Sequence, residues 1–250
     1  MTLAKLLLPL LLTASIPVSS TVLTHESDLE AVADGDVSSE EMVKVYLKRI
    51  AEIDDSGPML NAVITLNPDA LRQARRLDKE RRKGKLRGPL HGVPILLKDN
   101  IEAAGAMPTT AGSLALKDNI TNRDAPLVER LKAAGAIILG KTNLSEWANI
   151  RSDNSTSGWS AVGGLTKNPH SLLHNTCGSS AGSGAAMATR LAAATVGTET
   201  DGSITCPSSI NGVVGFKPTV GLVSRRFVVP ISHTQDTAGP MTLTDRKSVV

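Results

Sequence analysis

The stretch HGVPILLKDN, residues 91–100, decides the fold class of this 250-residue chain. Its apolar residues run continuously from Val93 to Leu97 instead of alternating with polar ones. Such a run is typical of a strand that is buried on both faces of a sheet. Lys98 follows directly, although an ammonium group is almost never fully buried unless it is paired. The stretch therefore predicts a buried strand with an amine at its end that needs a chemical explanation.

The segments on either side of this run alternate between helix and strand patterns. Ser38 and Glu41 form a capping box that opens a helix. The expected helices cover 38–50, 67–84, 125–135 and 180–194, the expected strands cover 61–66, 93–98 and 136–141, and 212–224 is expected to form short strands with glycine turns. This order predicts a single α/β domain with a mixed, mostly buried β-sheet flanked by helices.

The overall charge and composition argue against a nucleic-acid-binding protein. The chain has 27 basic and 24 acidic residues, for a net charge of +3, and only 2% of its residues are aromatic. The densest basic run, at 75–85, also carries Asp78 and Glu80, so we interpret it as the solvated face of a helix. Few aromatic rings are available to stack on bases.

The N-terminal residues 1–20 have the pattern of a secretory signal peptide. Lys5 precedes an apolar stretch, and small residues follow near position 20. We therefore expect cleavage there, secretion, and no membrane contact once the leader is removed. Export would allow Cys177 and Cys206 to pair, but two buried thiols fit the sequence better. It would also make the glycosylation sequons at Asn119, Asn143 and Asn154 relevant where they are exposed.

One motif in the chain is misleading. GAIILGKT, residues 135–142, matches the phosphate-binding pattern G-x-x-x-x-G-K-[ST] letter for letter. A phosphate loop needs a compact turn between its glycines, whereas Ala136 to Leu139 are apolar and resemble a strand. We therefore interpret Gly135 as the cap of a helix and the residues after it as a core strand.

The stretch CGSSAGSGAAMATRLAAATVGTETDGSITCPSS, residues 177–209, carries the strongest chemical signal. It contains two clusters of hydroxyl side chains, both next to apolar segments. A serine hydroxyl needs a base within hydrogen-bond reach to act as a nucleophile. None of the chain's five histidines lies in a familiar triad motif. A lysine can be that base if burial lowers its pKa from about 10.4. Such a role would explain why Lys98 follows a buried strand.

The chain resembles the amidase signature family, serine hydrolases that use a Ser-Ser-Lys triad. The resemblance runs from about residue 27 to residue 250. It rests on GPLHGVPILLKDNI (88–101), AGAIILGKTNLSEWAN (134–149), CGSSAGSGAA (177–186) and VGTETDGSITCPSSINGVVGFKPTVGLVS (196–224). It is closest in pattern to bacterial peptide amidases and their fungal relatives. Members of the family are usually much longer, so we expect the fold to be incomplete at the C-terminal end.

The resemblance implies a role for each matching position. Lys98 corresponds to the family's base, Ser179 to the bridging serine with a cis peptide bond, and Ser203 to the nucleophile. Ser180 corresponds to a supporting serine. The oxyanion hole corresponds to the backbone N–H groups of Thr200, Asp201 and Gly202, with that of Ser203 as a further donor.

The activity implied is hydrolysis of a carboxamide C–N bond to a carboxylic acid and ammonia or an amine, through an acyl-enzyme. The implied substrate is a small molecule or a peptide amide, and no metal or organic cofactor is expected. Two alternatives remain open: the glutaminase component of a tRNA-dependent amidotransferase, which shares these motifs, and a catalytically silent, truncated homologue. The amide substrate and the oligomeric state cannot be read from the sequence.

Overall fold

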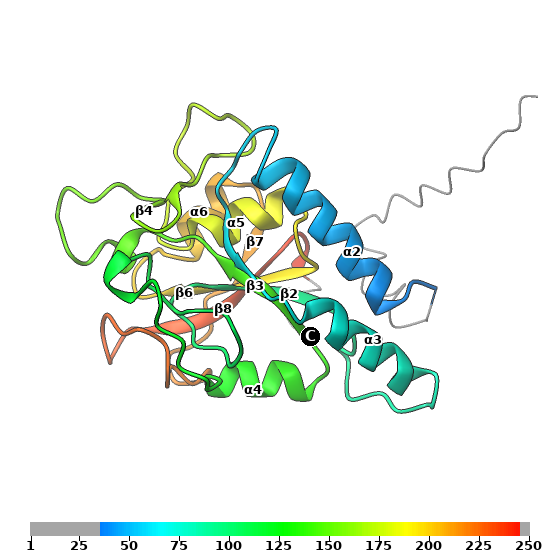
Figure 1. Ribbon diagram of the computed structural model, residues 1–250. Coiled ribbons are helices and arrows are strands. Elements are labelled where there is room, and N and C mark those ends of the chain that lie inside the picture. The colour runs from blue at the N-terminus through cyan, green and yellow to red at the C-terminus, as the bar shows by residue number, and fades with distance from the viewer. Residues whose placement is uncertain (1–35, 246–250) are drawn as a thin grey trace, which may run out of the picture.

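The computed structural model describes residues 36–245, so the expected leader at 1–20 lies outside the described residues. Its centre is a six-stranded mixed sheet in the order β1-β3-β2-β6-β8-β7 (Figure 1). The strands are β1 (Val63–Leu66), β2 (Pro94–Lys98), β3 (Ile137–Thr142), β6 (Ala194–Glu199), β7 (Val214–Gly215) and β8 (Thr237–Thr242), and a separate hairpin pairs β4 (Trp159–Ser160) with β5 (Gly164–Leu165). The predicted α/β class is confirmed.

The middle of the sheet places three strand ends at one edge. Strand β2 pairs in parallel with both β3 and β6, whereas every other pair in the sheet is antiparallel. The carboxyl ends of β2, β3 and β6 therefore lie side by side, which is where open α/β sheets usually bind ligands. Lys98 ends β2, and Thr198 and Glu199 end β6.

Helices cover the sheet on both sides. They are α2 (Ser39–Arg49), α3 (Ala70–Arg81), α4 (Pro126–Ala133), α5 (Ala181–Ala188) and α6 (Thr205–Ile210). Figure 1 shows α4 on the opposite side of the sheet from α5 and α6. The capping box of α2 is present, with Glu41 N–H donating to Ser38 Oγ and Ser38 N–H donating to Glu41. None of the helices within 36–245 is long and apolar enough to cross a membrane.

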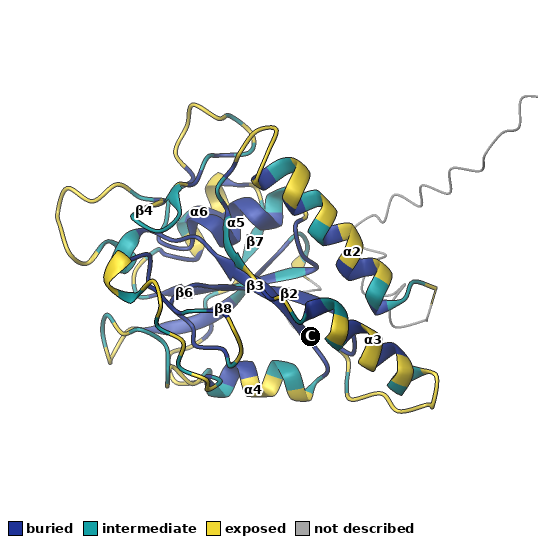
Figure 2. Cartoon of the chain, in the orientation of Figure 1, coloured by how far each residue is buried: buried dark blue, intermediate teal, exposed yellow. Residues whose placement is uncertain are grey.

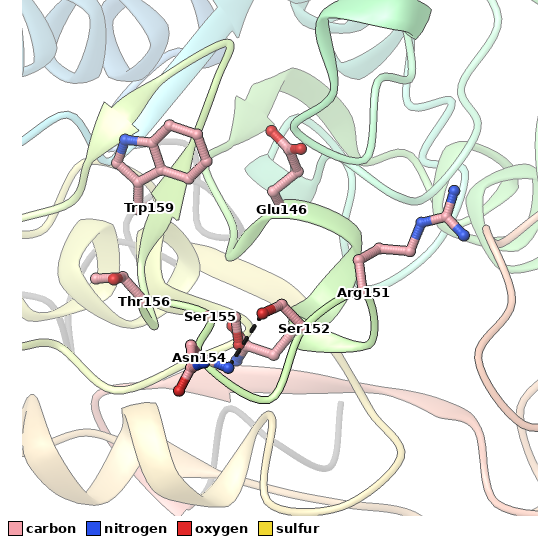
Figure 3. Close-up of a pocket in the computed structure, with 8 residues that line it drawn as sticks. Glu146, Arg151, Ser152, Asn154, Ser155, Thr156 and Trp159 are labelled. Atoms are coloured by element: carbon pink, nitrogen blue, oxygen red, sulfur yellow. Dashed lines mark hydrogen bonds between the residues drawn. The ribbon is translucent and has the colours of Figure 1, made fainter.

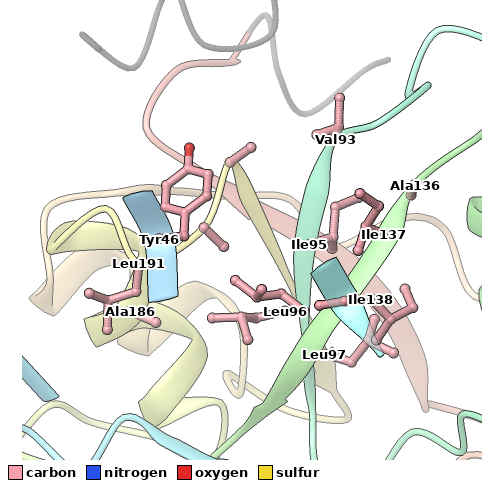
Figure 4. Close-up of a cluster of buried hydrophobic side chains, with 14 of the residues drawn as sticks. Tyr46, Val93, Ile95, Leu96, Leu97, Ala136, Ile137, Ile138, Ala186 and Leu191 are labelled. Carbon is pink, nitrogen blue, oxygen red and sulfur yellow. The ribbon is translucent and has the colours of Figure 1, made fainter. Parts of the chain in front are cut away.

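The continuous apolar run from Val93 to Leu97 is buried throughout. All five residues of β2 and all six of β3 are buried, and Figure 2 shows this central part of the sheet in the colour of buried residues. Figure 4 shows Tyr46 of α2, Ala186 and Leu191 on the same side of β2 as Leu96, within the cluster of buried side chains that also contains Ile95 and Ile138. The strand 137–142 also confirms that GAIILGKT is no phosphate loop, and Gly135 has the positive φ of a helix cap, +99°.

The structure corrects the sequence prediction after residue 180. The expected helix 180–194 is shorter, because α5 ends at Ala188 and Arg190 takes a positive φ of 57°. The chain then turns so that Ala193 N–H donates to Pro94 O and β6 joins β2. Strands β6 and β8 were not expected, and in 212–224 only Val214–Gly215 forms a strand of the sheet.

Candidate active site

The side chain of Lys98 is fully buried at the carboxyl end of β2. Its Nζ lies 2.7 Å from Ser179 Oγ, 2.9 Å from Thr198 Oγ1 and 3.2 Å from Thr198 O. The carbonyl oxygen can only accept a hydrogen bond, and Thr198 Oγ1 also accepts one from Asn100 Nδ2 at 2.9 Å. The amine is therefore tied to two oxygens of one residue and to a serine hydroxyl.

Burial lowers the pKa of Lys98 from its ordinary value of 10.5 to about 7, while the charges of Glu199 and Asp236 act in the opposite direction. An amine with this pKa is about half neutral at pH 7 and largely neutral one pH unit higher. A neutral amine has two N–H donors and one lone pair. If the donors point to the two Thr198 oxygens, the lone pair is left for the Ser179 hydroxyl, which makes Lys98 a base for that proton.

Ser179 and Ser180 are buried where the glycine-serine loop enters α5. The Gly178–Ser179 peptide bond is cis, as the family resemblance implied. Ser145 N–H donates to Ser179 O at 3.0 Å, which holds the loop from the β3 side. Ser180 Oγ donates to Thr198 O and accepts from Thr198 N–H, so Ser180 supports the residue that binds the lysine.

Ser203 lies next to the glycine-serine loop, in the turn that follows β6. Its carbonyl oxygen accepts a hydrogen bond from Ser180 N–H at 3.1 Å, and the residue is only 8% exposed. Lys98, the glycine-serine loop and the segment before α6 thus meet at one edge of the sheet. Sequence reasoning placed these positions together, although they are separated by as many as 105 residues along the chain.

The expected oxyanion hole is only partly available. The N–H of Gly202 donates to Glu199 Oε1 at 3.0 Å, so this donor is occupied, which departs from the expectation. The N–H groups of Thr200, Asp201 and Ser203 donate to no residue within 36–245. These three unpartnered donors around Ser203 could bind the negatively charged oxygen of a tetrahedral intermediate.

Sequence reasoning missed Glu199, whose carboxylate organises this turn. It also accepts the N–H groups of Ile204 at 2.7 Å and Thr205 at 2.8 Å, at the start of α6. Backbone groups on both sides of Ser203 are therefore held by one side chain, which also raises the pKa of Lys98 by its charge. A carboxylate inside the motif GTETDGS, just ahead of a helix, was the available signal.

Cys177 and Cys206 form a disulfide, with their Cα atoms 5.9 Å apart. The expectation of two separate thiols is therefore wrong. It failed because the chain between the two cysteines, which are 29 positions apart, folds back through α5 and β6, and sequence alone does not reveal how close this brings them. The bond joins a position two residues before Ser179 to one three residues after Ser203. The described residues contain no group of three or more His, Cys, Asp or Glu side chains that could hold a metal ion.

Comparisons with known proteins identify the family to which the chain is similar. The model of the family described as amidase matches residues 41–246. An Arthroderma benhamiae protein named as an amidase is 52% identical over 200 residues, which cover 80% of this chain and 33% of that protein. The native peptide amidase structure from Stenotrophomonas maltophilia has a TM-score of 0.87 and 57% identity, and the match covers 93% of this chain and 47% of that one.

A second class of relatives is more distant. A glutamyl-tRNA(Gln) amidotransferase component from Symbiobacterium thermophilum is 44% identical over 209 residues, covering 83% of this chain and 41% of that protein. The chain therefore spans between about a third and a half of the length of the relatives it matches.

Proposed function

The chain belongs to the amidase family, and we propose that it hydrolyses carboxamide C–N bonds through Lys98, Ser179 and Ser203. The observation that carries the proposal is the 2.7 Å contact between Lys98 Nζ and Ser179 Oγ, in a site where burial lowers the pKa of the lysine to about 7. A purely structural role poorly explains a fully buried lysine next to serines, because a buried ammonium group is more stable when it is paired with a carboxylate.

In the proposed reaction, neutral Lys98 takes the proton of Ser179 Oγ, and Ser179 takes the proton of Ser203 Oγ. Ser203 Oγ attacks the amide carbon, and N–H groups of the turn at 200–203 bind the resulting oxyanion. The relay then returns a proton to the leaving nitrogen as the C–N bond breaks. Water, activated by the same relay, attacks the acyl-enzyme and releases the carboxylic acid.

We propose linear carboxamides as the substrate class, including the C-terminal amide of a peptide. Support comes from the similarity to the Stenotrophomonas enzyme, which is named as a peptide amidase. The glutaminase function is the second candidate. It is favoured only by the 44% identity to the amidotransferase component, and it stands second because the amidase matches are closer.

The test is release of ammonia from a panel of simple carboxamides and dipeptide amides. Ser203→Ala is expected to abolish ammonia release, because it removes the proposed nucleophile. Ser209→Ala is the matched control: this exposed serine lies on α6, six residues further along the chain, and should leave the rate unchanged. Full activity in Ser203→Ala would refute the mechanism. Absence of ammonia release together with absence of fluorophosphonate labelling would support the silent-homologue alternative.

We also propose that the chain is exported. Support comes from the signal-peptide pattern at 1–20 and from the disulfide, since such bonds persist mainly in oxidising compartments. Mass spectrometry of the protein recovered from the culture medium tests this. We expect a mature N-terminus near residue 20 and Cys177 linked to Cys206; an intact N-terminus in a cytoplasmic fraction with free thiols would contradict it.

A further inference from the structure

The three glycosylation sequons lie in three different environments. Asn143 lies in the core: it is fully buried, and its Nδ2 donates to Asn61 O, Gly164 O and Thr166 Oγ1. Its Oδ1 accepts from the Ser160 hydroxyl at 2.7 Å. A sugar on this nitrogen would displace the packing around the β4–β5 hairpin, so the folded chain cannot carry a glycan there.

The sequon at Asn119 is engaged at both of its functional positions. Asn119 is half-buried, and its Nδ2 donates to Thr109 O at 2.9 Å. The hydroxyl of Thr121, the third residue of the sequon, hydrogen-bonds Glu102. Both groups that a glycosyl-transfer enzyme must reach are therefore already used within the fold.

The third sequon, Asn154-Ser155-Thr156, lies on an exposed loop. All three residues are exposed, and Figure 3 shows them along the loop, across from Glu146 and Trp159. Neither the side-chain amide of Asn154 nor the hydroxyl of Thr156 has a hydrogen-bond partner among residues 36–245. The loop is held instead by bonds from backbone groups, such as that from the backbone N–H of Asn154 to Ser152 Oγ at 3.1 Å. These side chains also border an open hollow of about 390 Å³, which leaves space for a sugar.

We propose that Asn154 is the N-glycan acceptor of this protein. The donor is an oligosaccharide linked to a lipid diphosphate. The bond between Asn154 Nδ2 and the first sugar carbon forms as the bond from that carbon to the diphosphate oxygen breaks. Nδ2 loses one proton, and the lipid diphosphate leaves. The modification requires passage through the secretory lumen, so the proposal rests on the proposed export. The experiment brings the chain into the lumen with an added leader, so its result does not depend on the native N-terminus.

The test places the complete chain behind a cleavable secretory leader of known efficiency in a eukaryotic cell. Glycan occupancy at each sequon is read by mass spectrometry after enzymatic deglycosylation in heavy-oxygen water, which labels each formerly glycosylated asparagine. The same unreduced digest reports the Cys177–Cys206 peptide pair and so identifies folded chains. We expect the label at Asn154 and none at Asn143 in disulfide-linked chains, with Asn119 unlabelled.

Two neighbouring exposed residues give matched variants. Thr156→Ala removes the hydroxyl that the sequon requires and should abolish the glycan, as Asn154→Gln should. Ser155→Ala changes the unconstrained middle position and should retain it. An unlabelled Asn154 in lumenal chains, or a labelled Asn143 in disulfide-linked ones, would overturn the proposal.

Discussion

Lys98 and Lys141 lie on neighbouring parallel strands, and both are completely buried. The register pairs Leu97 with Lys141 and Lys98 with Thr142, so the two amines leave the sheet on opposite faces. Burial lowers the pKa of both. The two positions therefore share strand geometry and desolvation and differ in what each amine meets.

Lys141 meets a carboxylate, whereas Lys98 meets hydroxyls. Lys141 Nζ lies 3.7 Å from Asp99 Oδ1, and it donates to Ile101 O and Thr109 Oγ1. Lys98 forms no ion pair with any residue in the described range; the carboxylates of Glu199 and Asp236 act on it only through their charge. A direct carboxylate stabilises the ammonium form, whereas a hydroxyl leaves the neutral amine available. The chemistry of the partner, more than burial, therefore distinguishes a structural lysine from one that can act as a base.

The largest expected effect comes from Lys98→Met. Loss of the base should lower turnover on the order of 10²–10⁴-fold. The fold should persist, because the loss of the amine's hydrogen bonds is offset by the removal of a group that is costly to bury. Steady-state turnover and thermal melting, measured on the same preparation, check both parts. A variant that unfolds would make Lys98 a structural residue like Lys141.

Lys141→Met should reverse this pattern. It leaves Asp99 buried without its cation, which costs roughly 3–5 kcal/mol of stability. Burial already raises the pKa of Asp99 to about 6, above its ordinary value of 3.8. A proton can therefore neutralise Asp99 in the folded state, so the loss should be smaller at pH 5 than at pH 8. Urea unfolding at both pH values measures it.

The double variant Asp99→Asn/Lys141→Met tests whether the broken ion pair causes this loss of stability. Removing both charges leaves neither buried alone, so stability should recover toward that of the unsubstituted chain. If the double variant is as unstable as the sum of the two single ones, the ion pair is not the reason for the loss.

A smaller effect is expected from Thr198→Val, which removes one of the two acceptors that orient the Lys98 amine. A lost hydrogen bond of about 1.4 kcal/mol corresponds to about a tenfold lower kcat. KM should change little, because Thr198 does not provide the proposed nucleophile or oxyanion donors. Thr198→Ser retains the hydroxyl and should restore most of the rate. An equal loss in both variants would point to packing of the methyl group instead.

The sequence predicted the parts of the fold that depend on continuous apolar patterning. The strands 94–98 and 137–142 match the expected ranges to within a residue because their residues are buried on both faces. Strand β8, by contrast, has the sequence TAGPMT, which lacks a run of large apolar side chains. Its place is set by pairing with β6, a long-range contact that local pattern cannot express.

The residues of the site also differ in how far the sequence predicts them. Lys98, Ser179 and Ser203 could be named because the motifs that resemble the amidase signature family assign a role to each of these positions. Thr198 and Glu199 act through hydrogen bonds whose partners depend on three-dimensional placement. The disulfide was missed for the same reason, since the approach of Cys177 to Cys206 follows from the path of α5 and β6.

The most direct test of a neutral, buried Lys98 is the pH dependence of Ser203 labelling by a fluorophosphonate, which needs no knowledge of the natural substrate. Between about pH 5 and pH 10 the second-order labelling rate should rise with a midpoint near 7, because Lys98 with a pKa of about 7 loses its proton there. The rising limb should vanish in Lys98→Met. A midpoint near 10.5, the ordinary lysine value, or a rate that Lys98→Met leaves unchanged, would contradict the account.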